Sequence, residues 1–172
     1  MRGPGCAVAL AIAGTAAGAA NALAQERITL VRLESRVEIP APSAKIWARL
    51  VRGADLAACW PVWSVPENAE RTLAAAGDRL QFTDEWGNQG ISVVTFVAPG
   101  EQLRIANDPT DGSYLCRTSF VLEPAGSGRT VLRWIESYSD ESSAADQAAT
   151  AAKVQAGMEK TLAAFAARVA GP

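Results

Sequence analysis

The longest helical pattern of the chain lies at its C-terminal end, over residues 140–170. Apolar side chains recur there at spacings of four, four, three and four residues, which aligns them along one face of a helix. A helix with one apolar face has to bury that face against another layer of structure. The residues of this stripe are Val154, Met158, Leu162, Phe165 and Val169.

Before this helix the sequence pattern is typical of a series of short strands. Apolar and polar residues alternate within segments that are separated by glycine, proline, asparagine and aspartate, which is typical of an antiparallel sheet. Two short helical patterns, 43–51 and 54–59, interrupt the series after its first member. We therefore predict an α+β fold, in which a curved antiparallel sheet of about seven strands wraps around the long C-terminal helix. The predicted strands are 29–39, 69–73, 78–86, 90–97, 102–107, 114–122 and 130–138.

The N-terminal residues have the features of a signal peptide. Arg2 precedes an uncharged apolar stretch over residues 6–20, and Ala22-Leu23-Ala24 supplies small residues for cleavage. The stretch is shorter than the roughly 20 residues that span a bilayer. We predict cleavage near Ala24, a single domain over residues 25–172, a periplasmic or secreted location and no stable membrane anchor.

Composition excludes several classes of function. The net charge of −2 becomes −3 without the leader, and a chain of this charge is not expected to bind nucleic acid. Histidine is absent, which excludes Ser-His-Asp and Cys-His catalytic arrangements and every histidine-based metal site. Residues 107–112 are rich in oxygen-bearing side chains, but they lack the spacing of a calcium loop and we predict a turn. We expect no metal and no cofactor.

Two cysteines, Cys59 and Cys116, follow the predicted leader. An even number of cysteines in an oxidising compartment permits one disulfide. The alternative is that both are buried thiols that pack as small apolar residues. The sequence does not decide between them.

Five segments together resemble the START/polyketide cyclase-like superfamily, also called SRPBCC, which includes the birch-pollen-allergen-like proteins. The resemblance covers residues 25–172 and implies the helix-grip fold, with a cavity between the sheet and the long helix. It implies an apolar or amphipathic small molecule as the ligand and carries no catalytic residue with it. The segments are VEIPAP at 37–42 followed by Ile46-Trp47 and Leu50, Trp60-Pro61, residues 96–103, residues 118–124 with 128–130, and residues 158–162.

Alternation predicts which aromatic side chains point inward. We predict that six large residues border the cavity, because aromatic groups offer apolar area and a polar handle for a ligand. The alternative for each residue is ordinary core packing. The six are Phe82, Trp86, Tyr114, Trp134, Tyr138 and Met158.

Asp84 and Glu136 fall in the apolar register of their strands. Burial would raise the pKa of either carboxyl group and would make it a candidate acid or base. The alternative, which we favour, is a position at the rim of the sheet, hydrated or paired with an arginine.

From the predicted leader, cavity and aromatic residues we expect an exported binding protein for a small apolar or amphipathic molecule. The alternatives are an enzyme of the cyclase, dehydratase or isomerase type and a protein-interaction module.

Overall fold

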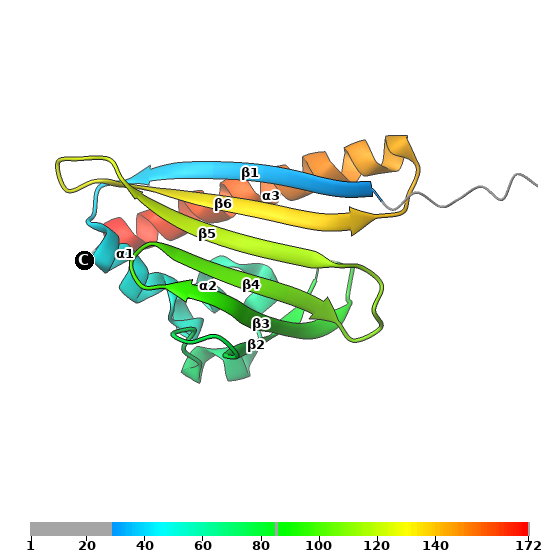
Figure 1. Ribbon diagram of the computed structural model, residues 1–172, viewed down its shortest axis with the longest axis horizontal. Coiled ribbons are helices and arrows are strands. Elements are labelled where there is room, and N and C mark those ends of the chain that lie inside the picture. Colours follow the sequence, from blue (N-terminus) through cyan, green and yellow to red (C-terminus); the bar gives the residue numbers. More distant parts are fainter. Residues whose placement is uncertain (1–28, 85, 172) are drawn as a thin grey trace, which may run out of the picture.

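The computed structural model describes residues 29–84 and 86–171, which form one antiparallel sheet with helices behind it (Figure 1). The strands are β1 (Thr29–Ile39), β2 (Arg79–Thr83), β3 (Gln89–Ala98), β4 (Gln102–Pro109), β5 (Cys116–Pro124) and β6 (Thr130–Asp140). Their order across the sheet is β1-β6-β5-β4-β3-β2. The predicted α+β helix-grip architecture is confirmed, whereas the predicted signal peptide lies outside the described residues.

The sheet has a buried inner face and an exposed outer face. Alternation along the paired strands β5 and β6 creates both faces, because successive side chains point to opposite sides. Polar residues share the inner face with apolar ones near the start of β5 and the end of β6. The inner residues are Cys116, Thr118, Phe120 and Leu122 on β5, and Leu132, Trp134, Glu136 and Tyr138 on β6.

The long helix α3 (Ala144–Ala170) lies behind the sheet and contacts β1 along its length (Figure 1). Ser143 caps its N-terminus by accepting a hydrogen bond from the backbone N–H of Asp146. The two halves of α3 differ in burial. None of residues 144–157 is fully buried, whereas the second half buries Met158, Thr161, Leu162, Phe165 and Val169.

Two short helices, α1 (Ser43–Leu50) and α2 (Gly53–Cys59), connect β1 to the rest of the molecule. The backbone passes close to itself at Gly53, where a Cβ atom would lie 1.9 Å from the carbonyl oxygen of Asn68. A glycine is therefore required at this position. Short 3₁₀ turns at Pro61–Trp63 and Pro66–Glu70 then lead to β2.

The described residues form six strands rather than the predicted seven. The segment 69–73 joins no strand, because Arg71 and Leu73 bond to the backbone of Gly53 and Val51 beside α2. Thr72 forms only an isolated bridge with Arg52. β2 is consequently left as an edge strand of the sheet.

The disulfide permitted by the sequence does not form. Cys59 on α2 and Cys116 on β5 are both free and buried. The alternative interpretation, two buried thiols, is the correct one for this structure. No helix among the described residues combines the length and the apolar character that crossing a membrane requires.

Candidate functional site

The predicted cavity-lining residues divide into three groups. Phe82, Trp134, Tyr138 and Met158 are more than nine-tenths buried, and Tyr114 is half-buried. Trp86 is 57% exposed, so it is not buried in a cavity as predicted. Because β2 ends at Thr83, strand alternation no longer applies at Trp86, and its ring lies under the Lys153 ammonium of α3 instead.

Asp84 organises the turn between β2 and β3. Its Oδ1 accepts hydrogen bonds from the backbone N–H groups of Trp86 (3.0 Å) and Asn88 (2.8 Å). Its Oδ2 accepts from the Asn88 amide (2.8 Å) and the Tyr114 hydroxyl (3.1 Å). Asp84 is therefore a rim residue with a turn-forming role, which agrees with the interpretation that we favoured.

Glu136 is different, and the favoured rim interpretation is wrong for it. It lies within β6 with 7% of its surface exposed. Its Oε2 accepts hydrogen bonds from Thr118 Oγ1 (2.8 Å) and Trp134 Nε1 (2.7 Å), and Cys116 Sγ donates to its Oε1. All three donors are neutral groups, and no arginine or lysine among the described residues forms an ion pair with this carboxylate.

A row of hydrogen bonds leads to Glu136 across four strands. Trp63 Nε1 donates to Ser92 Oγ (2.8 Å), and Ser92 donates to Asn107 Oδ1 (2.7 Å). The Asn107 amide then donates to Thr118 Oγ1 (2.9 Å) and Cys116 Sγ (3.3 Å), both of which bond to Glu136. We call the inner-face residues Ser92, Asn107, Cys116, Thr118 and Glu136 the polar row.

Burial shifts the pKa values of the ionisable groups around the polar row. Removal from water raises the pKa of Glu136, and the hydrogen bonds from Cys116, Trp134 and Thr118 oppose that rise. Burial and the neighbouring Glu136 raise the pKa of the Cys116 thiol. Burial also raises the pKa of Tyr138 and of Tyr114, with Asp84 adding to the rise at Tyr114. The Tyr138 hydroxyl has no hydrogen-bond partner among the described residues.

A second buried carboxylate, Asp55, shows the contrast with Glu136. Asp55 Oδ1 accepts from Arg49 (3.1 Å) and Arg168 (2.8 Å), and Arg52 lies 3.5 Å from Oδ2. These contacts tie α1 and α2 to the end of α3. Asp55 is therefore neutralised by three cations, whereas Glu136 has none among the described residues.

The space between α3 and the sheet is filled at one end. Trp60 lies at the centre of an aromatic cluster, with ring centroids 5.4 Å from Phe120 and Phe165 and 5.6 Å from Trp134. Trp63 completes the cluster at 5.8 Å from Trp60. These residues form the core instead of bordering a cavity, which applies to Trp134 among the predicted lining residues.

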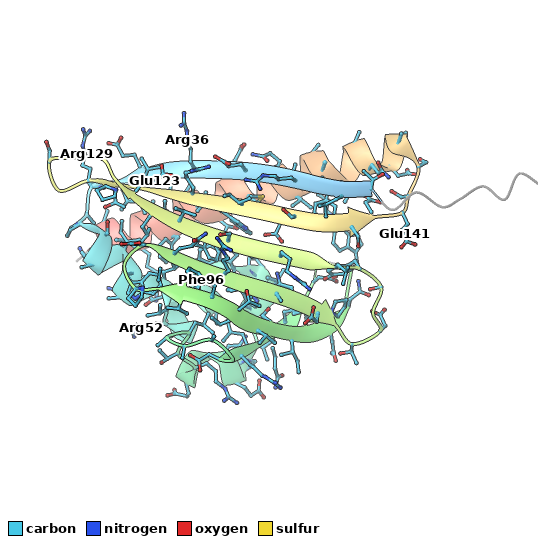
Figure 2. The ribbon with its side chains drawn as sticks, viewed as in Figure 1. Arg36, Arg52, Phe96, Glu123, Arg129 and Glu141 are labelled. Atoms are coloured by element: carbon cyan, nitrogen blue, oxygen red, sulfur yellow. The ribbon has the colours of Figure 1, made fainter. Side chains whose placement is uncertain are left out.

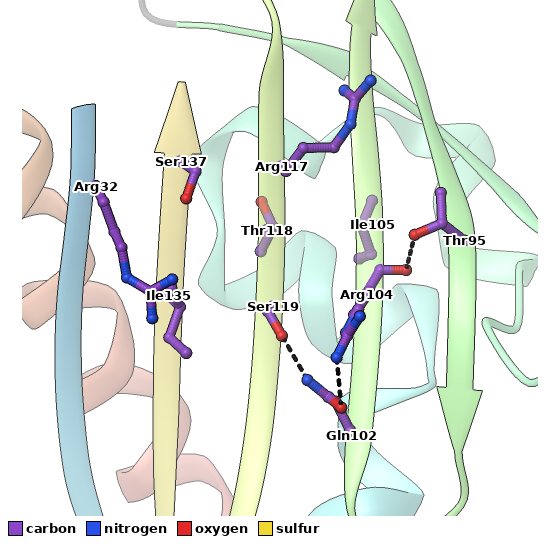
Figure 3. Close-up of a pocket in the computed structure, with 10 residues that line it drawn as sticks. All are labelled: Arg32, Thr95, Gln102, Arg104, Ile105, Arg117, Thr118, Ser119, Ile135 and Ser137. Atoms are coloured by element: carbon purple, nitrogen blue, oxygen red, sulfur yellow. Dashed lines mark hydrogen bonds between the residues drawn. The ribbon is translucent and has the colours of Figure 1, made fainter. Parts of the chain in front are cut away.

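Two hollows stand out among the described residues, and neither lies between the sheet and α3. One, of about 470 Å³, lies beside the start of β2. The other, of about 530 Å³, is a groove on the outer face of the sheet (Figure 3). The predicted inner cavity is thus not one of them. We call the second hollow the outer groove; its walls include Arg32, Arg104 and Arg117, and its floor includes Gln102, Ser119 and Ser137.

Sequence reasoning identified Glu136 but missed the rest of the polar row as a unit. The alternation along β4 could have revealed it, because Asn107 lies two residues after Ile105 and four after Leu103 and therefore points to the same inner face. Thr118 likewise alternates with the buried residues of β5 and points to the inner face. What the sequence lacks is the register that places Thr118 opposite Glu136 and Asn107 opposite Cys116.

Comparison with known proteins identifies the fold. No protein-family model matches the chain, and no curated protein sequence matches it. A solved structure from Arthrobacter aurescens is similar with a TM-score of 0.61 at 18% identity, over 82% of this chain and 87% of that one. A solved structure from Mesorhizobium loti has a TM-score of 0.59 at 17% identity, over 79% of this chain and 94% of that one. DynU16, a protein of the dynemicin biosynthetic locus, has a TM-score of 0.53 at 18% identity, over 81% of this chain and 45% of DynU16. At these identities the likeness establishes the fold.

Proposed function

We propose that the chain is an exported START/polyketide cyclase-like protein that binds a small amphipathic molecule between the polar row and the N-terminal half of α3. The observation that carries this proposal is the Glu136 carboxylate, which is buried with no cation beside it among the described residues, although the same chain neutralises Asp55 with three arginines. Burying an ionisable group without a partner of opposite charge costs several kcal/mol, and groups buried at such a cost cluster at functional sites.

The surroundings of Glu136 favour a ligand that brings a hydrogen-bond donor or a positive charge. A protonated amine beside the carboxylate would compensate its charge and lower its raised pKa. Tyr138, two residues along on the same face, offers a hydroxyl that has no partner within the described chain. The apolar body of the ligand would lie against the side chains of α3.

Access to this site depends on the first half of α3. Residues 144–157 bury no side chain fully, so moving this half away from the sheet exposes less apolar surface than moving the second half. Opening this half would break the hydrogen bonds from Gln155 to Glu34 and Ser35 of β1, while Met158, Leu162 and Phe165 would keep the rest of the helix in place. A ligand that binds this open form would stabilise it.

A second candidate function is catalysis, favoured by one specific observation. The raised pKa of Glu136 keeps a proton on a carboxyl group at a higher pH than usual, which suits a general acid in a cyclase, dehydratase or isomerase. The donors around Glu136 would hold it in one orientation. This candidate differs from simple binding because removing the acidic proton would stop turnover while leaving affinity for a neutral substrate.

Binding is tested first with three amphiphiles of equal chain length and different head groups: octylamine, octanol and octanoate. Calorimetric titration should rank octylamine above octanol and octanol above octanoate. Glu136→Gln should weaken octylamine binding by about tenfold or more, because hydrogen bonds to charged groups contribute about 1.5–3 kcal/mol. The matched control is Glu101→Gln, which removes an exposed carboxylate from the turn between β3 and β4 and should leave all three affinities unchanged.

The position of the site is tested with Ala151→Trp, which adds bulk to the half-buried side of the first half of α3. We expect it to block octylamine while leaving the thermal transition in place. Native mass spectrometry of protein from its own host should show a co-purified small molecule. An affinity order that does not change with the head group, or Glu136→Gln binding octylamine as well as the parent chain, would refute the proposed site.

Export is tested separately by sequencing the N-terminus of the protein recovered from its own host. A mature chain that begins at Gln25 in a periplasmic or secreted fraction is the expected result. Recovery of Met1 from the cytosol would refute export.

A further inference from the structure

The outer groove is produced by the register of four strands. Ser137 on β6 lies opposite Arg32 on β1 and opposite Arg117 on β5, and Ser119 on β5 lies opposite Arg104 on β4. Small side chains therefore sit at the centre, with long cationic side chains on both sides. The result is the hollow of about 530 Å³ that faces away from the polar row, on the other side of the sheet.

The charges of the groove are only partly compensated. Arg117 pairs with Asp108 at 3.2 Å. Arg32 and Arg104 form no ion pair with any acidic residue in the described part of the chain, and the nearby Glu34 is held by Arg133 (2.9 Å). The outer groove thus carries net positive charge on a chain whose overall charge is negative.

The Arg104 guanidinium is held in position by its neighbours. It lies 5.0 Å from the ring centroid of Phe96, and its Nη2 donates to Gln102 Oε1 (3.3 Å). Gln102 in turn donates to Ser119 Oγ (3.0 Å), so a chain of contacts fixes the side chain over β4 (Figure 3). The Arg32 side chain reaches from β1 to Ile135 on β6 (Figure 3). Little side-chain entropy would be lost when Arg104 binds an anion.

We infer that the outer groove binds a phosphate group or a comparable oxyanion with two negative charges. Arg32 and Arg104 would supply forked N–H donors, which match the geometry of a phosphate, and the Ser119 and Ser137 hydroxyls would complete the site. The phosphate group would belong either to a soluble molecule or to a lipid headgroup. This site is independent of the proposed ligand at Glu136, because the sheet separates the two.

The test uses pyrophosphate as the soluble probe, titrated into the purified chain at about 150 mM salt and followed by NMR chemical shifts. At this ionic strength exposed charges more than about 8 Å apart are screened, so binding requires a formed site. Arg32→Ala and Arg104→Ala should each weaken binding by about tenfold. Arg104→Lys should recover only part of the affinity, because lysine keeps the charge but lacks the fork.

The matched control is Arg36→Ala, which removes the same charge from β1. Figure 2 shows Arg36 at the edge of the sheet, pointing away from the molecule, and it does not line the groove. Its affinity for pyrophosphate should change by less than about twofold, since only long-range attraction is lost.

A second arm distinguishes the source of the phosphate. Co-sedimentation with vesicles of phosphatidylcholine containing phosphatidic acid, compared with phosphatidylcholine alone, tests a lipid headgroup. Pyrophosphate binding without vesicle binding supports a soluble ligand, and vesicle binding lost in Arg32→Ala supports a headgroup. Binding to neither probe, or equal losses in Arg32→Ala and Arg36→Ala, would overturn the inference.

Discussion

The inner face of the sheet has two regions, one that buries apolar side chains and one that buries polar side chains. Around Trp60 the rings of Phe120 on β5, Trp134 on β6 and Phe165 on the second half of α3 form an interlocked aromatic core. Around Glu136 the same strands carry the polar row, and the first half of α3 buries no side chain fully against them. One region maximises apolar contact, and the other places hydrogen-bonding groups where apolar residues would be more stable.

This difference indicates which region can depart from good packing without unfolding the protein. The aromatic core holds the sheet and the helix together, and the cluster of Asp55 with its arginines fastens α1 and α2 to the same end of α3. The polar region is then free to deviate from good packing, as functional sites commonly do. Mutations in the two regions should therefore differ in size and in their dependence on pH.

The largest effect is expected in the aromatic core. Trp60→Ala should lower the free energy of unfolding by about 3–5 kcal/mol, because it removes a fully buried ring and leaves a cavity among four other aromatic side chains. Urea denaturation measures the loss. Trp86→Ala is the control, since that ring is largely exposed, and it should cost less than about 1 kcal/mol. Equal losses would mean that the ring at the centre of the aromatic core contributes no more to stability than an exposed ring does.

The two buried carboxylates give the next comparison. Asp55→Asn should destabilise the fold by about 2 kcal/mol, because three arginines lose their anion at the junction of α1, α2 and α3. Glu136→Gln leaves no cation of the described residues unpaired and removes a buried ionisable group, so it should keep or raise the stability at neutral pH. Thermal denaturation of both variants measures the difference. The reverse order would contradict the assignment of Asp55 to structure and Glu136 to function.

The pH dependence of stability should come from the polar region. The folded-state pKa of Glu136 is raised, so the folded chain retains this proton more strongly than the unfolded chain does. As pH rises from the ordinary glutamate pKa to the raised one, Glu136 should therefore reduce stability. Urea titrations across this window should show a shallower pH dependence in Glu136→Gln than in the parent chain. In Glu101→Gln the slope should stay that of the parent.

The smallest effect is expected on the outer surface. Arg129 and Glu38 form an ion pair at 2.8 Å in which both side chains are about half exposed. Arg129→Ala should change the free energy of unfolding by less than about 0.5 kcal/mol, because water and salt weaken an exposed pair. A loss above about 1 kcal/mol in urea denaturation would show that the outer face contributes more to stability than its exposure indicates.

Most of the fold was predictable because its signals are local. The α3 stripe from Met158 to Val169 is buried as its spacing predicts, and alternation along β6 assigned Trp134, Glu136 and Tyr138 to the inner face correctly. The errors occurred where alternation no longer applied. Trp86 lies beyond the end of β2, and residues 69–73 found backbone partners beside α2 instead of in the sheet.

The sequence by itself determined the elements and the face on which each strand residue lies, because helical and strand periodicities are properties of neighbouring residues. Tertiary structure alone decided the partners. Strand register placed Cys116 and Thr118 against Glu136 and left Arg32 and Arg104 without acidic partners in the described part of the chain. The packing of α1, α2 and α3 gathered arginines around Asp55. Whether a buried carboxylate is neutralised depends on side chains as far away in the chain as Arg168 is from Asp55, and no local pattern carries that information.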